Sequence, residues 1–198
     1  YDAQTNSATV LRLIREHHLD FKVLLGAWLD AEVSNPACPW HPEPWPDDVL
    51  AANKRKNAEE IQRAIRLANQ FPDIVMAVAV GNEALVSWND HMVPVESVLG
   101  YVRQVKEAIA QPVTVADNYD WWAKHGDALA RELDFVSVHI YPIWEGRDID
   151  EAMSYGIANL EAVRLPREAE IRPEWRPDLL GGVVTLQAAG RRLDPSAW

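Results

Sequence analysis

Cysteine is nearly absent from this chain, which has one, Cys38, among 198 residues. An internal disulfide framework is therefore excluded. Apolar runs are also short, well below the roughly 20 residues that a membrane-spanning helix needs, so we expect no membrane span in this segment. Basic residues are outnumbered, with 19 Lys and Arg against 30 Asp and Glu, for a formal net charge of −11. This charge argues against nucleic acid or an anionic membrane surface as a partner.

A glycine-rich phosphate loop is also missing, because none follows any of the apolar runs. The usual nucleotide-binding signature of an open α/β sheet is therefore absent. The six histidines show no metal-ligand spacing, and the adjacent His17 and His18 cannot face one site from a helix. We expect no metal and no other cofactor. The chain begins at Tyr1 rather than Met, so the lack of a visible leader leaves its localisation open.

Short apolar runs alternate with segments of helical periodicity. Buried strands are predicted at residues 21–29, 74–80, 112–116 and 135–140, and helices at residues 7–17, 53–69, 95–110 and 150–163. Strands without polar alternation are buried on both faces, as in parallel sheets covered by helices. The pattern predicts an α/β fold, and the missing phosphate loop favours a (β/α)8 barrel over a doubly wound sheet.

Tryptophan, by contrast, is abundant, with nine in the chain. Eight fall at or just after the end of a predicted strand, which in a (β/α)8 barrel is the face where the active site is built. Flat indoles suit sugar rings, whose C–H faces stack on them, and the loop at residues 34–48, stiffened by five prolines, has room for two such platforms. The eight are Trp28, Trp40, Trp45, Trp88, Trp121, Trp122, Trp144 and Trp175.

The apolar strand at residues 74–80 ends abruptly in Gly81, Asn82 and Glu83. Barrel enzymes place catalytic groups at this position. Burial disfavours the ionised form of a carboxyl group, which suits a general acid, and an amide such as that of Asn82 can hydrogen-bond a sugar hydroxyl. The alternative interpretation is a structural Glu83 paired with an arginine from a helix.

The Val-Gly-Asn-Glu run at residues 80–83 resembles the acid/base signature of glycoside hydrolase family 17, a family of β-1,3-glucanases and glucan transglycosylases. Residues 21–29 are similar to the third strand of that family's barrel and residues 135–142 to its sixth. The Trp-Glu-Gly run at residues 144–146 resembles the bacterial branch. The similarity covers about residues 10–166 and implies a single, partial barrel domain over residues 1–198, with strands three to seven recognisable and a divergent tail at 167–198.

The resemblance implies a retaining mechanism, with Glu83 as acid/base and a second carboxylate about 5 Å away as nucleophile. In the family the nucleophile ends the seventh strand, in a Glu-x-Gly-Trp-Pro pattern. The matching residues 166–177 are charged here and contain Pro173, which argues against a central strand. Glu174 stands where the nucleophile is expected, and we predict it for that role. The alternative is that the carboxylates of this region are all solvated and a nucleophile is absent.

Further substrate contacts are predicted at the ends of the other strands. Tyr141 closes the sixth strand at a position that faces the substrate in the family, whereas for His139 packing is the favoured role. Asn118 ends the fifth strand, where the family also places groups that contact sugars. The predicted substrate-binding residues are Asn82, Tyr141, Trp28, Trp144, Trp88, Asn118 and Trp121.

Two functions follow from these predictions. The first is a retaining glycoside hydrolase or transglycosylase whose partner is a β-1,3-linked, or mixed β-1,3/1,6-linked, glucan oligosaccharide or polysaccharide. The alternative is an inactive barrel remnant that binds carbohydrate through its tryptophan-rich face. Isomerase or aldolase chemistry would need a lysine at a strand end or a phosphate loop, and neither is found. Because the family's first two strands have no counterpart here, we interpret the chain as the middle of a barrel within a larger polypeptide.

Overall fold

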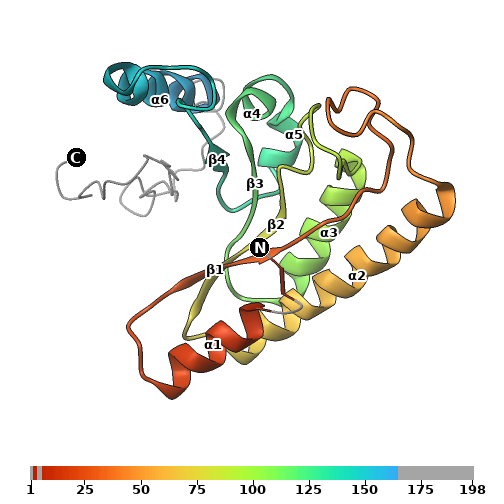
Figure 1. Ribbon diagram of the computed structural model, residues 1–198. Coiled ribbons are helices and arrows are strands. Elements are labelled where there is room, and N and C mark those ends of the chain that lie inside the picture. The colour runs from red at the N-terminus through yellow and green to blue at the C-terminus, as the bar shows by residue number, and fades with distance from the viewer. Residues whose placement is uncertain (1, 4–5, 165–198) are drawn as a thin grey trace.

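Four parallel strands form one sheet in the order β1-β2-β3-β4. The computed structural model describes residues 2–3 and 6–164 of the chain. The strands are β1 (Val23–Ala27), β2 (Val75–Asn82), β3 (Val113–Asn118) and β4 (Ser137–His139). Figure 1 shows them following one another across the molecule in chain order. Parallel strands that pair with their neighbours in the chain and are joined through helices define the (β/α)8 barrel type of fold.

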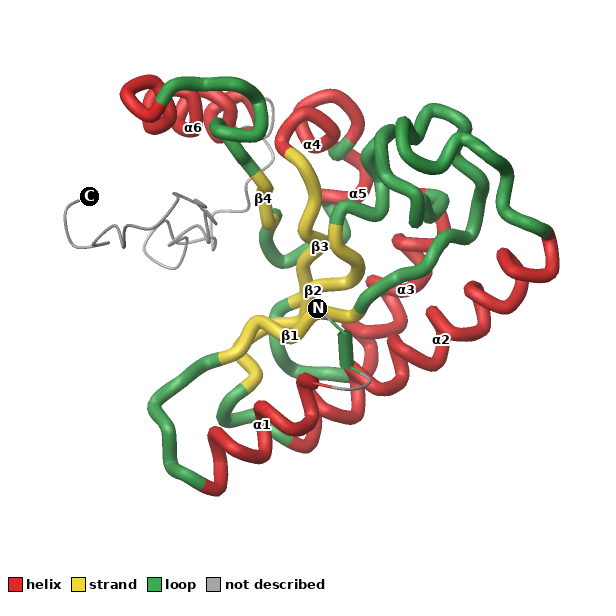
Figure 2. The backbone as a smooth tube through the Cα atoms, in the orientation of Figure 1, coloured by secondary structure: helices red, strands yellow, loops and turns green. Residues whose placement is uncertain are grey.

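Helices connect these strands and cover the sheet. They are α1 (Asn6–Glu16), α2 (Asp47–Gln70), α3 (Val95–Ala108), α4 (Tyr119–His125), α5 (Asp127–Ala130) and α6 (Ile149–Arg164). Helix α2 contacts β1 and β2, and α3 contacts β2 and β3. Figure 2 shows α2 and α3 together on one side of the strands. Among the described residues, no helix is long and apolar enough to cross a membrane.

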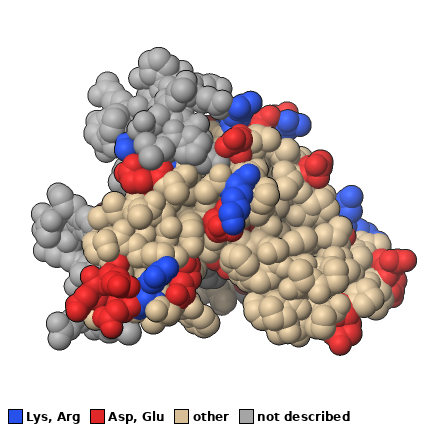
Figure 3. Space-filling model, turned by 90° about the horizontal axis from the view of Figure 1, so that it is seen from above, with Lys and Arg blue, Asp and Glu red and all other residues tan. Residues whose placement is uncertain are grey.

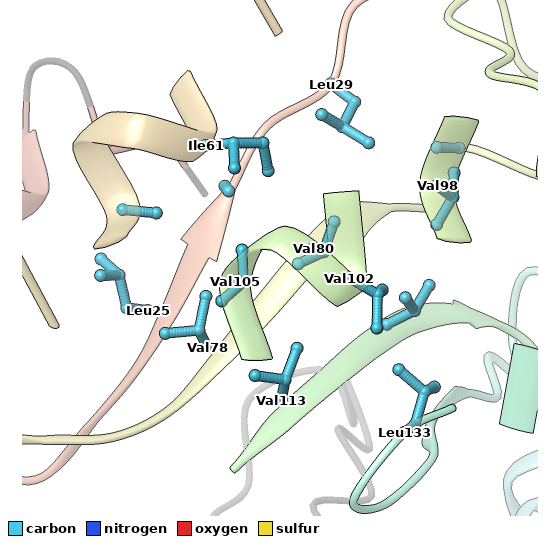
Figure 4. Close-up of a cluster of buried hydrophobic side chains, with 14 of the residues drawn as sticks. Leu25, Leu29, Ile61, Val78, Val80, Val98, Val102, Val105, Val113 and Leu133 are labelled. Carbon is cyan, nitrogen blue, oxygen red and sulfur yellow. The ribbon is translucent and has the colours of Figure 1, made fainter. Parts of the chain in front are cut away.

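The hydrophobic core lies between the strands and this pair of helices (Figure 4). Helix α3 contributes Val98, Val102 and Val105, which recur at the spacing of one helical face, and α2 contributes Ile61. Full burial of such a side chain stabilises the fold by about 1.5–3 kcal/mol. The strand residues that meet them include Leu25, Val78, Val80 and Val113, all nearly inaccessible to solvent.

The sequence predictions of the four strands and of four helices are confirmed, with two differences. Helix α2 begins at Asp47, well before the predicted start at residue 53, because Pro46 precedes it and acidic residues occupy its first turn. Helices α4 and α5 were not predicted. The side chain of Asn118 accepts a hydrogen bond from the backbone N–H of Asp120 and so caps α4 directly after β3.

The predicted α/β barrel type of fold is confirmed by the all-parallel sheet and its chain-order pairing. The region matched to the family's seventh strand, residues 166–177, lies outside the described residues. Glu174 and Trp175 lie there as well, so their predicted places stay predictions.

Candidate active site

A cavity of about 540 Å³ opens at the carboxyl ends of the strands. Every segment that lines it follows a strand, from the β1–α2 loop to the turn after β4. Small-molecule sites commonly have volumes of about 300–1,000 Å³. The cavity therefore lies at the face where barrel enzymes build their active sites. Its lining residues are Trp40, Glu83, Trp88, Asn118, Tyr141, Trp144 and Glu145.

Glu83 enters the cavity from a strained backbone at the end of β2. Its φ angle is 49°, in the left-handed region that non-glycine residues seldom adopt, and Gly81 two residues earlier has a φ of 80°. A Cβ on Gly81 would also lie 3.2 Å from Cδ1 of Leu29. The pairing of β2 with β3 is irregular between Ala79 and Asn82. Such irregularities redirect side chains at the rims of barrels, as this one redirects Glu83.

The carboxylate of Glu83 is held by His139 of β4. Its Oε1 lies 2.8 Å from Nδ1 of His139, and the two side chains are 24% and 10% exposed. The backbone N–H of Glu83 donates to the carbonyl of Ala116 at 2.8 Å, which ties the residue to β3. The side-chain partner of Glu83 is thus the imidazole of His139 on β4, two strands along the sheet from β2, and not an arginine from a helix.

A second carboxyl group, that of Asp117, is fully buried beside this arrangement. It accepts hydrogen bonds from the backbone N–H groups of Leu85 at 3.0 Å and Asn118 at 2.7 Å. Burial raises the pKa of Asp117 to about 7, and the nearby charge of Glu83 acts in the same direction. Asp117 therefore links the segment after Glu83 to β3 and titrates in the neutral range.

Glu145 provides the other carboxylate that lines the cavity. The hydroxyl of Tyr119 donates to its Oε2 at 2.9 Å, and the hydroxyl of Tyr155 donates to the same oxygen. The guanidinium of Arg147 lies 4.6 Å from the ring centre of Tyr155. Burial raises the pKa of Tyr119, and the neighbouring Tyr155 and Glu145 raise it further. The phenol of Tyr119 therefore stays a neutral hydrogen-bond donor to Glu145.

Three tryptophans line the cavity with unusually open rings. Trp144 is 84% exposed, Trp40 62% and Trp88 37%. Tryptophan is highly buried on average, so open indoles around one cavity indicate a surface made to be covered by a ligand. Figure 3 shows the face seen from above as mostly uncharged, with acidic and basic side chains around its edges and a few near its middle.

The structure brings five of the predicted site residues together and places the others elsewhere. Glu83, Trp88, Asn118, Tyr141 and Trp144 line the cavity. The remaining three described residues lie outside the lining: Asn82 has a buried amide oxygen with no hydrogen-bond partner among the described residues, Trp28 stacks on His91, and Trp121 packs edge-on against Trp122 in the core.

Two groups of the site were missed or misjudged from the sequence. His139 does not line the cavity but contacts Glu83 instead of only packing, and its place at the end of a predicted strand was the available signal. Glu145 carried no such signal, because its tyrosine partners come from α4 and α6. Within the described part of the chain, no group of three or more His, Cys, Asp or Glu residues is arranged to hold a metal ion.

Comparison with protein families identifies the class of protein to which this site belongs. Residues 1–167 match the model of the BtgE/BtgC glycoside hydrolase domain. The match covers most of the chain, so the chain belongs to this family of glycoside hydrolase domains. Among curated proteins, none matches the sequence.

Solved structures with the same fold are also enzymes of glucan chemistry. An endo-laminarinase from Formosa Hel1_33_131 is similar with a TM-score of 0.68 and 24% identity, over 86% of this chain and 53% of that one. A glycoside hydrolase family 17 β-1,3-glucanosyltransferase from Rhizomucor miehei gives a TM-score of 0.58 at 24% identity, over 94% and 56% of the two chains. An active-site mutant of the Rhizomucor miehei enzyme, in complex with laminaritriose, aligns equally well. The present chain thus spans little more than half the length of these proteins.

Proposed function

We propose that this chain carries the acid/base side of a retaining glycoside hydrolase or transglycosylase site for β-1,3-linked, or mixed β-1,3/1,6-linked, glucans, with Glu83 as the acid/base. The observation that supports this most is the position of Glu83. It projects from the end of β2 into a cavity with three open indoles, and the imidazole of His139 lies 2.8 Å from its carboxylate. Membership of a glycoside hydrolase family supports the same reaction class.

The proposed reaction has two steps. Glu83 gives its proton to the glycosidic oxygen as the bond from that oxygen to the anomeric carbon breaks, while a second carboxylate forms a bond to the same carbon. Glu83, now ionised, then takes a proton from water or from an acceptor sugar hydroxyl as that oxygen displaces the carboxylate. Glu174 remains the candidate nucleophile, and it lies outside the described residues.

The proposed substrate class rests on the cavity and on the similar structures. Indole rings such as those of Trp40 and Trp144 offer flat apolar faces to the C–H faces of sugars. Glu145, fixed by two tyrosine hydroxyls, offers an acceptor to a sugar hydroxyl. The solved structures of similar fold are named for laminarin and β-1,3-glucan chemistry, which supports a β-1,3-glucan here.

The test is turnover of laminari-oligosaccharides by Glu83→Gln. Removal of a general acid and base lowers kcat by about 10²–10⁴-fold, so the variant should lose nearly all activity. Glu132→Gln is the matched control, because this exposed glutamate pairs with Arg103 on the surface. Undiminished turnover by Glu83→Gln would remove Glu83 from the mechanism.

The second candidate function is carbohydrate binding without catalysis. It is favoured by one observation, that three indoles, those of Trp40, Trp88 and Trp144, line the cavity, whereas the predicted nucleophile lies in a charged, proline-containing segment of the sequence. Quenching of tryptophan fluorescence by laminaritriose, with no release of product over long incubation, would select this function over the first.

A further inference from the structure

Two loops on the rim of the cavity are joined by one buried asparagine. The β1–α2 loop carries Trp40, and the β2–α3 loop carries Trp88. The side-chain amide of Asn35 donates to the carbonyl of Ser87 at 2.8 Å and to that of Asn89 at 2.7 Å. These two carbonyls flank Trp88 in the sequence. Asn35, 7% exposed, therefore contributes to the spacing between the loops that carry two of the open indoles, together with the backbone hydrogen bonds from Glu32 and Val33 to Met92.

A second buried asparagine joins the β2–α3 loop to Glu83 itself. The side-chain amide of Asn89 donates to the main-chain carbonyl of Glu83, and Asn89 is 3% exposed. A left-handed backbone at a non-glycine residue costs free energy and persists only where its surroundings hold it. The carbonyl that accepts this hydrogen bond belongs to Glu83 itself. The bond therefore stabilises the left-handed backbone conformation that directs the Glu83 carboxylate into the cavity.

The neighbouring residues attach the same loop further, both to the end of β2 and to the β1–α2 loop. His91 places Nε2 3.0 Å from the carbonyl of Asn82, and its Nδ1 is 3.0 Å from Asp90. The ring of Trp28 stacks on His91 with 4.6 Å between ring centres, and the indole N–H of Trp45 donates to the carbonyl of Asp90 at 3.0 Å. The loop is thus attached on one side to the Trp40 loop and on the other to the acid/base strand.

We propose that Asn35 and Asn89 are positioning residues, of which Asn35 sets the distance between the Trp40 and Trp88 platforms and Asn89 holds the backbone of Glu83 in its productive conformation. This inference rests on the proposed function. It assigns the two asparagines different consequences: loss of Asn35 weakens sugar binding, and loss of Asn89 weakens proton transfer.

The two consequences separate on a pair of substrates. The sugar oxygen displaced from a laminari-oligosaccharide is a poor leaving group and needs a proton, whereas dinitrophenolate leaves without one. Only the oligosaccharide therefore requires a well-placed general acid. For Asn89→Ala we expect kcat/KM to fall about tenfold or more on the oligosaccharide and much less on a dinitrophenyl β-glycoside of the same sugar. For Asn35→Ala we expect KM to rise several-fold on both substrates, with kcat nearly unchanged.

Asn53→Ala is the matched control. Asn53 is also buried, at 8% exposure, and also donates to a backbone carbonyl, that of Ala31 at 3.0 Å, but it does not line the cavity. All three variants should lower the melting temperature, and only Asn89→Ala should change the ratio of the two kcat/KM values. Should Asn89→Ala fail to fold, Asn89→Ser takes its place. An unchanged ratio in a folded Asn89 variant, or unchanged KM in Asn35→Ala, overturns the proposal.

A protein that cleaves neither substrate contradicts the proposed function, and the positioning of Glu83 is then measured without turnover. The imidazole resonances of His139 report its contact with the Glu83 carboxylate. Asn89→Ala should shift them, and Asn53→Ala should leave them in place. Resonances of His139 that are the same in both variants would show that Asn89 does not position Glu83.

Discussion

Among the residues that the structure describes, two carboxylates line the cavity, Glu83 after β2 and Glu145 after β4, and their surroundings differ. Glu83 comes from a strained backbone, is mostly shielded from solvent, and contacts an imidazole. Glu145 comes from a turn and accepts hydrogen bonds from two phenols. An imidazole can exchange protons near neutral pH, whereas a phenol with a raised pKa only donates a hydrogen bond. We therefore propose proton transfer for Glu83 and recognition of sugar hydroxyls for Glu145.

The largest expected effect on stability is a pH dependence that comes from Asp117, the buried carboxyl group beside Glu83. Asp117 has a pKa of about 7 in the folded protein, against about 3.9 for an unfolded aspartate. The folded state therefore binds an extra proton between these values, and this contribution to stability is complete below pH 4 and lost as the pH rises through 7. From pH 5 to pH 8 the loss is on the order of 3 kcal/mol.

Denaturant unfolding of the wild type and of Asp117→Asn at several pH values measures this contribution. The variant should be less stable at pH 5, because its amide nitrogen replaces one of the two oxygens that accept the backbone hydrogen bonds and cannot accept one itself. Its free energy of unfolding should fall less than that of the wild type between pH 5 and pH 8. If the free energies of unfolding of the two proteins fell in parallel with rising pH, Asp117 would not be neutral in the folded protein at pH 5.

The next effect concerns the partner of Glu83. His139→Ala removes the imidazole that fixes the carboxylate, and we expect kcat on laminari-oligosaccharides to fall by a factor of about 30, or about 2 kcal/mol, with little change in KM. Steady-state kinetics over a range of pH values give both constants. A rise in KM at constant kcat would contradict a role of His139 in proton transfer and would indicate a role in substrate binding.

Glu145→Gln should have a smaller effect, and one on KM rather than on kcat. The amide keeps the shape of the side chain but loses the charge that strengthens its hydrogen bonds, so KM should rise about tenfold, or about 1.4 kcal/mol, at nearly constant kcat. Isothermal titration of laminaritriose into the Glu83→Gln and Glu83→Gln/Glu145→Gln proteins would measure the same loss without turnover. Equal affinity of the two proteins would contradict a binding role for Glu145.

The smallest expected effect is that of Tyr155→Phe. It removes one of the two hydrogen bonds to Glu145 and leaves the hydroxyl of Tyr119, so KM should rise by a factor of about 5, or about 1 kcal/mol. Tyr101→Phe is a fitting control, because Tyr101 donates to Glu32 at 2.6 Å outside the cavity lining. A similar rise of KM in both variants would show a general loss of packing.

The sequence predicted the parts of this molecule that depend on local patterns. Apolar runs and helical stripes identified β1 to β4, and the abrupt end of β2 identified Glu83. What it could not predict depends on contacts between distant segments. The contact of His139 with Glu83 spans 56 residues, and that of Asn35 with Asn89 spans 54.

The tryptophans show the same division. Their positions after strands correctly indicated the face of the site, but Trp121 turned into the core because Asn118 starts a short helix that was not predicted. Trp28 likewise stacks on His91 and does not line the cavity. A side chain in a loop or short helix takes its direction from local backbone geometry, which periodicity does not encode.

The most direct test of the division between the two carboxylates compares Glu83→Gln with Glu145→Gln on two substrates. On a laminari-oligosaccharide, kcat/KM of Glu83→Gln should fall by about 10²–10⁴, while the first turnover of a dinitrophenyl β-glycoside, which needs no proton, should be nearly as fast as in the wild type. Glu145→Gln should lose a similar factor on both substrates. If Glu83→Gln instead slowed both substrates equally, or neither, Glu83 would not be the general acid.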